Sequence, residues 1–530
     1  MAGSRSRAFG AALLVVLALS GLAYSQERRS QREHSRAEPT SAQRAQKPNI
    51  IVLESDDQSV SQFQRAIMPR TFREIVDSGT TFSQMVATPP LCCPSRAATI
   101  TGDYPHNNGV IDNGRRAYPK LVDKENVLPV WLQRAGYRTG LVGKFIDGYV
   151  RAGGRLPAPG WDHWFMFGKP RSYWGPTILD NDRFRKFGSH RYLTDVLNRD
   201  ANQFVRSHVG KKDPFFLWYA PWAPHRAEAD GADRDAPACA SNAKALPLPS
   251  EYKRFKHAQV PDLSRPSFNE SDVSDKPAPF DDLPPLSSGD VRTIKERWRC
   301  GAAALATFDR GIGEIVRTLR RAGELDNTMI VYTSDNGVSF GEHRIPHGKI
   351  RPTDEANRVP TVIRPATSQI HARREVSDEP VGMVEVAPTI LDAADARPCN
   401  AGGCRTIDGT SMWPLLVNPE ARSWNSDRGL LLELDHGNCS YTAIRTTDLT
   451  YVRYRDPVRR ANPPLTCPGD GGSEFYDRAS DPYELHNLAA AGDLISLVGD
   501  AVAGGEMAHR LQRLETCSGH PGTRAPNPCE

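Results

Sequence analysis

Four short apolar runs constrain the fold of this 530-residue chain more than any other feature of its sequence. Each run has four or five residues, and long helical or irregular stretches separate them. Continuous apolar runs of this length are typical of buried parallel strands. We therefore expect an α/β protein, whose large domain has a central mixed, mostly parallel sheet flanked by helices on both faces. The runs are residues 49–53, 139–142, 215–219 and 329–333.

Chemically useful side chains follow all four runs. In open α/β sheets, ligands bind beyond the carboxyl ends of the strands, so we expect these side chains to gather at one edge. A single apolar run followed by polar residues is more often a strand that ends in a solvated turn. Four such runs in one chain weaken that interpretation. The residues are Asp56 and Asp57, Lys144, His225, and Asp335 with Asn336.

Two of the segments between the predicted strands have the periodicity of helices. Apolar residues recur at helical spacing over 193–206 and over 297–321, and Gly323 is expected to end the second helix. Residues 225–290 are rich in Pro, Asp and Ser and show little periodicity. A loop this long in a compact domain is usually functional, often as a wall of the substrate site.

The N-terminus has the pattern of a secretory signal peptide. Arg5 and Arg7 precede an apolar stretch, and small residues then stand at cleavage spacing, which predicts a signal peptide over 1–25. The apolar stretch is short for a membrane-spanning helix of ~20 residues. Residues 26–47 are polar and Arg-rich, as in a disordered leader. We expect a secreted or extracytoplasmic enzyme that is free of the membrane after signal cleavage.

Cysteine content and charge narrow the class of protein further. The net charge is +4 and no long basic run is present, which argues against a nucleic-acid partner. Ten cysteines suit an oxidising compartment, although sequence alone does not fix their connectivity. Cys92 and Cys93 are expected to stay unpaired, because adjacent cysteines rarely bridge. The expected disulfides are Cys239/Cys300, Cys399/Cys404, Cys439/Cys467 and Cys517/Cys529.

The predicted domain organisation follows these signals. A catalytic domain is expected over 48–397 and a smaller C-terminal subdomain over 398–503. The subdomain should contain an antiparallel sheet with strands such as 429–434 and 449–454. The tail, residues 504–530, is expected to be irregular.

The segment C-C-P-S-R-A-A-T-I-T-G over 92–102 is the strongest chemical signal. Pro94 suits the first turn of a helix and Gly102 its end, which predicts Cys92 at a helix N-terminus. The helix dipole stabilises an anion there, and Arg96 can reach back toward the same point, so an activated thiolate is expected. The alternative is a buried structural cysteine pair.

This segment resembles the signature of type I sulfatases, a family within the alkaline-phosphatase-like superfamily. The signature is C-x-P-S-R, four variable residues and T-G, and the chain matches all six fixed positions. Residues 48–58, 326–337 and 474–488 are similar to further family segments. The resemblance implies that a formylglycine-generating enzyme oxidises Cys92 to formylglycine. The aldehyde hydrate would then attack sulfur, and its second hydroxyl would release sulfate.

The resemblance also implies a metal site that includes the modified Cys92. Carboxylate and amide oxygens, with no His among them, favour Ca²⁺ or Mg²⁺ over zinc, and the family usually holds calcium. The ion would act as a Lewis acid on the sulfate. The implied oxygen ligands are Asp56, Asp57, Asp335 and Asn336.

Three basic residues resemble the family's sulfate-binding groups. Lys144 in G-K-F and Lys349 in G-K would neutralise charge on the sulfate oxygens. His225 would be the acid for the leaving group or a donor to sulfate. Arg96 completes the implied catalytic set.

The chain departs from the family at two positions. Ile146 stands where many arylsulfatases have a histidine, which leaves the base of the elimination step open between His343 and His347. Asp354 stands where glutamate is commoner.

The Cys92-Cys93 doublet and the missing histidine resemble the N-acetylglucosamine-6-sulfatase and extracellular heparan endosulfatase branch. A sulfated amino sugar or glycosaminoglycan is therefore the leading substrate, and endo or exo action stays open. The alternatives are a broad arylsulfatase, a phosphonate or phosphodiester hydrolase of the same superfamily, and a non-catalytic glycan-binding protein.

Overall fold

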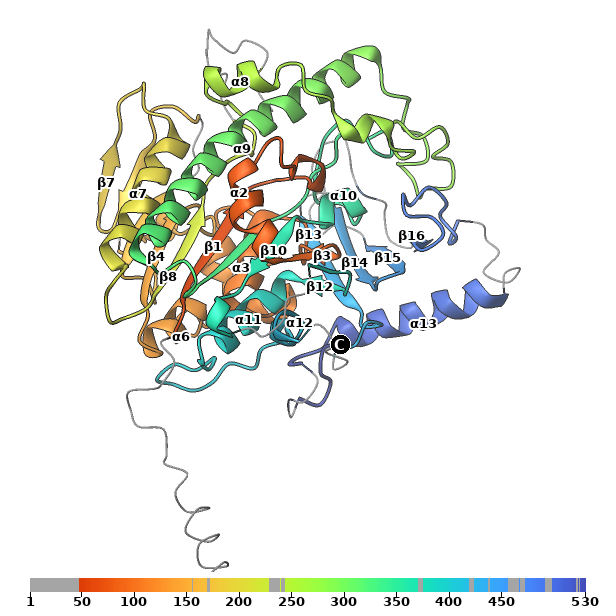
Figure 1. Ribbon diagram of the computed structural model, residues 1–530. Helices are drawn as coiled ribbons and strands as arrows, with labels where there is room; N and C mark the ends of the chain where they lie inside the picture. Colours follow the sequence, from red (N-terminus) through yellow and green to blue (C-terminus); the bar gives the residue numbers. More distant parts are fainter. Residues whose placement is uncertain are drawn as a thin grey trace, which may run out of the picture. The chain divides into compact units, whose positions relative to one another are not determined.

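Figure 1 shows the computed structural model of the chain. The predicted signal peptide and leader lie outside the described residues, except Lys47. No helix in the described part is long and apolar enough to cross a membrane. The structure describes residues 47–530 apart from 155, 169–171, 228–238, 240–243, 370–374, 419–423, 437–438, 456–466, 468–471, 491–497, 521–522 and 524.

A ten-stranded sheet forms the centre of the fold, in the order β11-β2-β10-β9-β1-β8-β4-β5-β6-β7. The five strands from β9 to β5 pair in parallel, which confirms a mixed, mostly parallel sheet. The strands are β1 Asn49–Ser55, β2 Thr80–Phe82, β4 Arg138–Gly143, β5 His163–Phe167, β6 Thr177–Asp180, β7 Arg183–Lys186, β8 Phe215–Ala220, β9 Thr328–Ser334, β10 Thr361–Arg364 and β11 Val376–Ser377. A separate pair joins β3 Met85–Val86 to β12 Val381–Gly382.

The four predicted strands are β1, β4, β8 and β9, and they are adjacent in the sheet. Ile50 pairs with Phe216 on one side and with Met329 on the other. Because these strands run in the same direction, their carboxyl ends meet at one edge. The sheet therefore brings together the polar residues that follow each strand.

Helices cover both faces of the sheet (Figure 1). Ile50 and Val52 of β1 belong to the same core as α3, α6 and α11, whereas Ile51 and Leu53 pack into the core formed with α7 and α9. This alternation explains why every residue of β1 is buried. The helices are α2 Pro69–Glu74, α3 Cys92–Thr101, α4 Pro105–Asn108, α5 Ala117–Lys120, α6 Leu128–Arg134, α7 Leu193–His208, α8 Pro249–Phe255, α9 Ser288–Ala322, α10 Asp354–Asn357, α11 Val386–Ala393, α12 Trp413–Val417 and α13 Val498–Leu514.

Both predicted helices are present, but α9 begins earlier than predicted. It starts at Ser288, because Ser287 and Asp290 form a capping box that satisfies free backbone N–H groups. Ile294 and Trp298 are buried and extend the apolar face toward this start. The helix ends at Gly323, whose φ of +73° is the left-handed C-cap expected of glycine.

The C-terminal part contains the predicted antiparallel sheet. The two strands expected there appear as β13 and β15, and all four predicted disulfides are confirmed. The strands are β13 Leu430–His436, β14 Cys439–Arg445, β15 Leu449–Arg455 and β16 Ser473–Asp477.

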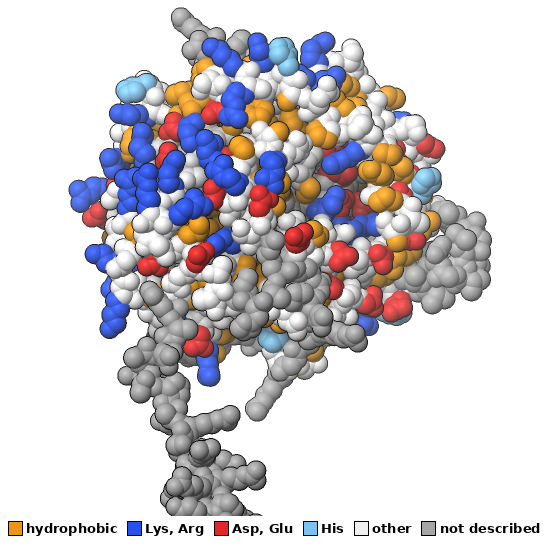
Figure 2. Space-filling model, in the orientation of Figure 1, with side chains coloured by type: hydrophobic (Ala, Val, Ile, Leu, Met, Phe, Trp, Pro, Cys, Tyr) orange, Lys and Arg blue, Asp and Glu red, His pale blue; other side chains and the backbone are white. Residues whose placement is uncertain are grey.

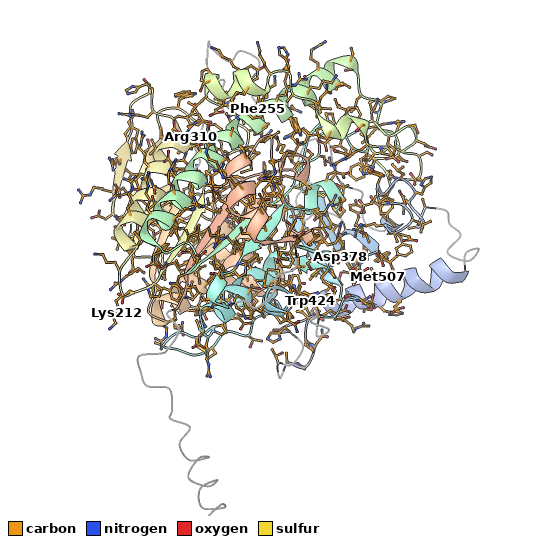
Figure 3. The ribbon with its side chains drawn as sticks, viewed as in Figure 1. Lys212, Phe255, Arg310, Asp378, Trp424 and Met507 are labelled. Atoms are coloured by element: carbon orange, nitrogen blue, oxygen red, sulfur yellow. A yellow bond between two sulfur atoms is a disulfide. The ribbon has the colours of Figure 1, made fainter. Side chains whose placement is uncertain are left out.

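The prediction of an irregular tail was wrong for its first part, because α13 runs to Leu514. Met507 (labelled in Figure 3), Leu511 and Leu514 are buried at helical spacing and join the large core cluster. The tertiary contact stabilises a helix whose two adjacent glycines, 504 and 505, weaken its local helical signal.

Candidate active site

The edge formed by β1, β4, β8 and β9 carries the six predicted side chains in contact with one another. Lys144 Nζ lies 2.6 Å from Asp56 Oδ2, and His225 Nε2 lies 3.6 Å from Asp57 Oδ2. The backbone N–H of Asp57 donates to Asp335 Oδ1 at 3.1 Å. Asn336 Nδ2 donates to Asp57 Oδ1 at 2.8 Å. The structure therefore places residues from four distant segments in one cluster.

Cys92 joins this cluster as the first residue of α3. Its Sγ lies 3.7 Å from Asp56 Oδ1 and 3.9 Å from Asp57 Oδ1. Lys349 Nζ donates to Cys92 Sγ at 2.8 Å, lies 3.4 Å from Asn336 Oδ1 and also bonds Asp57. Position 92, the acidic residues and the second predicted lysine thus share one site.

Arg96 is fully buried and holds the acidic side chains in place. Its Nη1 lies 2.7 Å from Glu54 Oε2, and its Nε donates to Asp335 Oδ2 at 3.0 Å. The guanidinium also donates to the backbone carbonyl of Lys144 at 3.3 Å. The hydrogen bonds of Arg96 go to Glu54 of β1, to Asp335 directly after β9 and to the backbone of Lys144 directly after β4, and none to Cys92 is present in the described structure. Its contacts give it a positioning role.

Burial opposes the activated thiolate that the helix N-terminus predicts for Cys92. Burial raises the pKa of the Cys92 thiol to about 12, despite the opposing charges of Lys144 and Lys349. The helix N-terminus was expected to lower this pKa, but loss of solvation has the larger effect. The raised pKa favours the neutral thiol of Cys92 over the thiolate.

The acidic cluster is suited to a hard cation. One ligand atom each from Asp56, Asp57, Cys92 and His225 lies within 4.8 Å of all the others. Burial and the neighbouring Asp335 carboxylate raise the pKa of Asp56 to about 7. The charges of Lys144 and Arg96 oppose this rise. Carboxylate and amide oxygens in such a cluster fit Ca²⁺ or Mg²⁺.

Asp57 occupies a strained backbone conformation, with φ of +65°. A non-glycine residue in the left-handed region costs of order 1–3 kcal/mol and occurs most often at functional sites. Although burial raises it, Lys349, His225 and Lys144 bring the pKa of Asp57 below its usual range. The fold thus keeps this carboxylate ionised and directed into the cluster.

His225 is oriented by its backbone. Its Nδ1 lies 2.7 Å from the carbonyl oxygen of Arg226. A carbonyl only accepts, so Nδ1 carries the proton and Nε2 faces Asp57. Burial lowers the pKa of His225 to about 4, against the opposing effect of Asp57.

The two histidines that are candidates for the base of the elimination step lie in different surroundings. His343 Nδ1 lies 2.7 Å from Glu270 Oε2, in a buried ion pair. His347 instead lines the same pocket as Asp57. His347 is therefore the better placed of the two. Ile146 is buried, and Asp354 is held in salt bridges to Arg358 and Arg445.

We expect the His343 ion pair to make stability depend on pH. Burial lowers the pKa of His343, but the hydrogen bond to Glu270 and the charges of Glu355, Glu270 and Glu484 together raise it to about 9. This stabilisation is complete below the unfolded pKa, near 6.5, and is lost as the pH rises through 9. Between pH 6.5 and 9 the wild type should lose on the order of 2 kcal/mol more unfolding free energy than His343→Gln. Urea unfolding at both pH values tests this, and parallel losses would contradict it.

Gly143 positions Lys144 at the end of β4. Its φ is +125°, and a Cβ there would lie 2.0 Å from the carbonyl oxygen of Ala220. That same carbonyl accepts a hydrogen bond from Lys144 N at 2.7 Å. Any side chain at position 143 would therefore push the lysine away from Asp56.

Gly143→Ala should lower kcat/KM about 100-fold, because displacement of a binding group by about 1 Å has effects of this size. Gly210→Ala is the matched control, since Gly210 also has a positive φ, +70°, but no atom within 4 Å of a built Cβ. Sulfate release and urea unfolding of both variants separate the clash from general backbone strain. Equal activity of the two variants would show that the position of Lys144 is unimportant.

Several residues near the site had no sequence signal. Glu54 belongs to the apolar strand β1, yet it pairs with Arg96. Gln62, Arg226 and Arg297 line a pocket beside Asp57. Their proximity depends on packing between distant segments, so no local pattern could have predicted it.

Comparisons with known proteins agree with this geometry. The sequence profile of the Sulfatase family matches residues 48–396. An arylsulfatase of Volvox carteri is 30% identical over 481 residues, which cover 85% of this chain and 72% of the relative. Human N-acetylglucosamine-6-sulfatase is 27% identical over 513 residues, covering 91% and 86% of the two chains.

A solved structure, described as in complex with its substrate D-glucosamine-2-N,6-O-disulfate, has the same fold. Its TM-score is 0.65 at 23% sequence identity, and the match covers 88% of this chain and 97% of that one. The profile match spans the strands and the helix that build the cluster around Cys92. The chain therefore belongs to the sulfatase family and is a sulfuric ester hydrolase.

Proposed function

We propose that this protein hydrolyses sulfate esters of amino sugars or glycosaminoglycans, in the manner of an N-acetylglucosamine-6-sulfatase. One observation carries the proposal: Cys92 Sγ lies within 4 Å of Asp56 and Asp57 and 2.8 Å from Lys349 Nζ. A substrate sulfate beside position 92 would therefore meet both the acidic cluster and a cation of the chain.

Two groups complete the proposed site. Formylglycine made from Cys92 would supply the attacking oxygen and the means of releasing sulfate, and a Ca²⁺ or Mg²⁺ ion would polarise a sulfate oxygen. A formylglycine-generating enzyme would carry out the oxidation of Cys92. The oxygen ligands for the ion would be Asp56, Asp57, Asp335 and Asn336.

The remaining residues have distinct proposed roles. Lys144 and Lys349 bind the sulfate oxygens and stabilise the charge that develops on them. His225 would supply a proton to the leaving oxygen of the sugar from its doubly protonated form, which carries a proton on Nε2 as well as Nδ1 and which the charge of Asp57 favours. Arg96 positions Asp335 and touches no substrate. His347 is the proposed base for the final proton transfer, since it lines the pocket at Asp57.

Three observations support an anionic glycan as substrate. The human relative is an N-acetylglucosamine-6-sulfatase, and the matched structure binds a sulfated glucosamine. Figure 2 shows Lys and Arg side chains gathered over the part of the molecule that contains β7. Arg183, Arg185 and Lys186 of β7 are all exposed. This positive surface would attract a sulfated polymer.

We also propose that the protein acts outside the cytoplasm. The signal-peptide pattern of residues 1–25 and the four disulfides support secretion. Residues 26–47 would then form the leader, and residues 48–397, 398–503 and 504–530 the catalytic, C-terminal and tail segments.

A substrate panel tests the proposed function. Protein whose Cys92 conversion has been checked by peptide mass spectrometry is assayed on N-acetylglucosamine 6-sulfate, 4-nitrophenyl sulfate and a phenylphosphonate monoester. We expect kcat/KM to be highest for the sulfated sugar. Preference for the aryl sulfate or the phosphonate would favour the corresponding alternative. Glycan binding without turnover, with an unmodified thiol at position 92, would favour a binding protein.

A further inference from the structure

A pocket beside the acidic cluster is lined by two arginines for which the described residues provide no salt-bridge partner. Its lining includes Asp57, Arg226, Arg297 and His347. Arg226 follows His225 after β8, and Arg297 lies on α9. The pocket therefore opens from the proposed reaction centre toward two arginines from separate elements.

Neither arginine has a salt-bridge partner among the residues that the structure describes. The Nε atom of Arg297 is buried and has no hydrogen-bond partner. Burial and the charge of Arg226 lower the pKa of Arg297. The neighbouring Lys244, by contrast, is paired with Glu296 at 2.5 Å. A buried N–H donor without an acceptor is costly, and the second arginine lies beside it, so the unpartnered Nε of the partly buried Arg297 points to an anion supplied by a ligand.

The pocket also has an unpaired hydrogen-bond acceptor. Gln62 is 1% exposed, and its Nε2 donates to the carbonyl of Trp298 at 3.0 Å, while its Oε1 has no partner in the described structure. Gly301 lets Gln62 pack closely against α9, because a Cβ at position 301 would lie 2.5 Å from Gln62 Nε2. A hydroxyl or amide N–H of a sugar could donate to Gln62 Oε1. The lining thus offers both an anion site and a polar contact.

We propose that Arg226 and Arg297 form a second anion subsite, which binds a sulfate or carboxylate on the same substrate whose sulfate ester is cleaved at position 92. The inference rests on the proposed function and narrows it to saccharides with two anionic groups. Lys144 and Lys349 contact the acidic cluster, where the proposed function has them bind the sulfate ester that is cleaved at position 92. Two guanidinium groups suit the second anion, because each can make paired hydrogen bonds to its oxygens.

The test compares substrates that differ in the second anion. The first substrate, N-acetylglucosamine 6-sulfate, has one anionic group. The second substrate, glucosamine 2-N,6-O-disulfate, has two. A disaccharide of a uronic acid and N-acetylglucosamine 6-sulfate carries a carboxylate instead. The measured quantity is the ratio of kcat/KM for each two-anion substrate to that for the one-anion sugar. The more favoured substrate identifies the second anion as sulfate or carboxylate.

In the wild type this ratio should be well above one. In Arg297→Met, and separately in Arg226→Met, it should fall about 30-fold, the usual effect of losing a charged hydrogen bond. Arg226 is exposed, so its replacement should not disturb folding. Arg292→Met is the matched control, because Arg292 is an exposed arginine of the same helix that lies outside the pocket lining. Its ratio should equal that of the wild type.

Two failures can be told apart. If the wild type hydrolyses both sugars with a ratio near one that no variant changes, the subsite is wrong and the proposed function stands. If the wild type cleaves neither sugar, the proposed function fails, and calorimetry then decides on the subsite. In a Cys92→Ala background, Arg297→Met should weaken binding of glucosamine 2-N,6-O-disulfate about 30-fold. Equal dissociation constants would overturn the subsite.

Discussion

Replacing Cys92 with alanine should reduce sulfate release about 10⁵-fold or more, because the variant cannot form the attacking group. Serine at this position should fail as well, since it supplies only one hydroxyl. The side chain is buried at the start of α3, and its loss leaves the hydrogen bonds of Asp57 to Asn336 and Lys349, and of Lys144 to Asp56, in place. We therefore expect the variant to fold. The measurements are kcat/KM for the best sulfated substrate and urea unfolding.

Cys93→Ala is the matched control for this prediction. Cys93 is also buried, but its Sγ accepts a hydrogen bond from Asp147 N at 3.3 Å and belongs to the core. Its replacement should cost stability and leave turnover within about tenfold of the wild type, since it removes packing rather than a reacting group. Normal activity of Cys92→Ala would refute the assignment of the nucleophile. Equal loss in both variants would show that folding, and not chemistry, explains the effect.

Asp57→Asn should lower kcat/KM about 1,000-fold at low calcium, which is comparable to the loss of a key electrostatic group. The substitution keeps the shape of the side chain and removes one negative charge from the cation site. It also weakens the contact to Lys349 Nζ. Asparagine tolerates the left-handed backbone conformation of this position, so the fold should survive. Part of the activity should return as the calcium concentration is raised.

The measurement is kcat/KM and thermal unfolding as a function of free Ca²⁺, starting from protein treated with a chelator. The wild type should lose activity on chelation, regain it with Ca²⁺ or Mg²⁺ and melt at a higher temperature when the ion is bound. Asp213→Asn is the control, because Asp213 forms an exposed pair with Arg138. Full wild-type activity in the presence of the chelator would contradict the cation site.

Much of the fold was predictable from local sequence. The strands β1, β4, β8 and β9 are buried on both faces, so they appear as continuous apolar runs. The residues after them could be placed at one edge because parallel strands end together. The motif around Cys92 identified its helix, and the spacing of the cysteines was compatible with the pairing that the structure shows.

The electrostatics of the site and the contacts between distant segments were harder to predict from the sequence. The helix N-terminus suggested an activated thiolate, but only the packed structure shows that burial dominates at Cys92. Arg96 lies one turn from Cys92 in the sequence pattern, yet its ion-pair partners are Glu54 of β1 and Asp335, which directly follows β9. The helix over 504–514 was missed because its stability comes from burial of Met507 and Leu511.

The sequence by itself determined which chemical groups the chain carries and the strand ends from which they project, because periodicity and short motifs are local properties. The tertiary structure decided which of these groups meet. It joined Glu54 to Arg96 and brought Arg226 and Arg297 into one pocket with Asp57. Such contacts depend on how strands and helices far apart in the chain pack, and burial at those contacts then sets the charge and reactivity of each side chain.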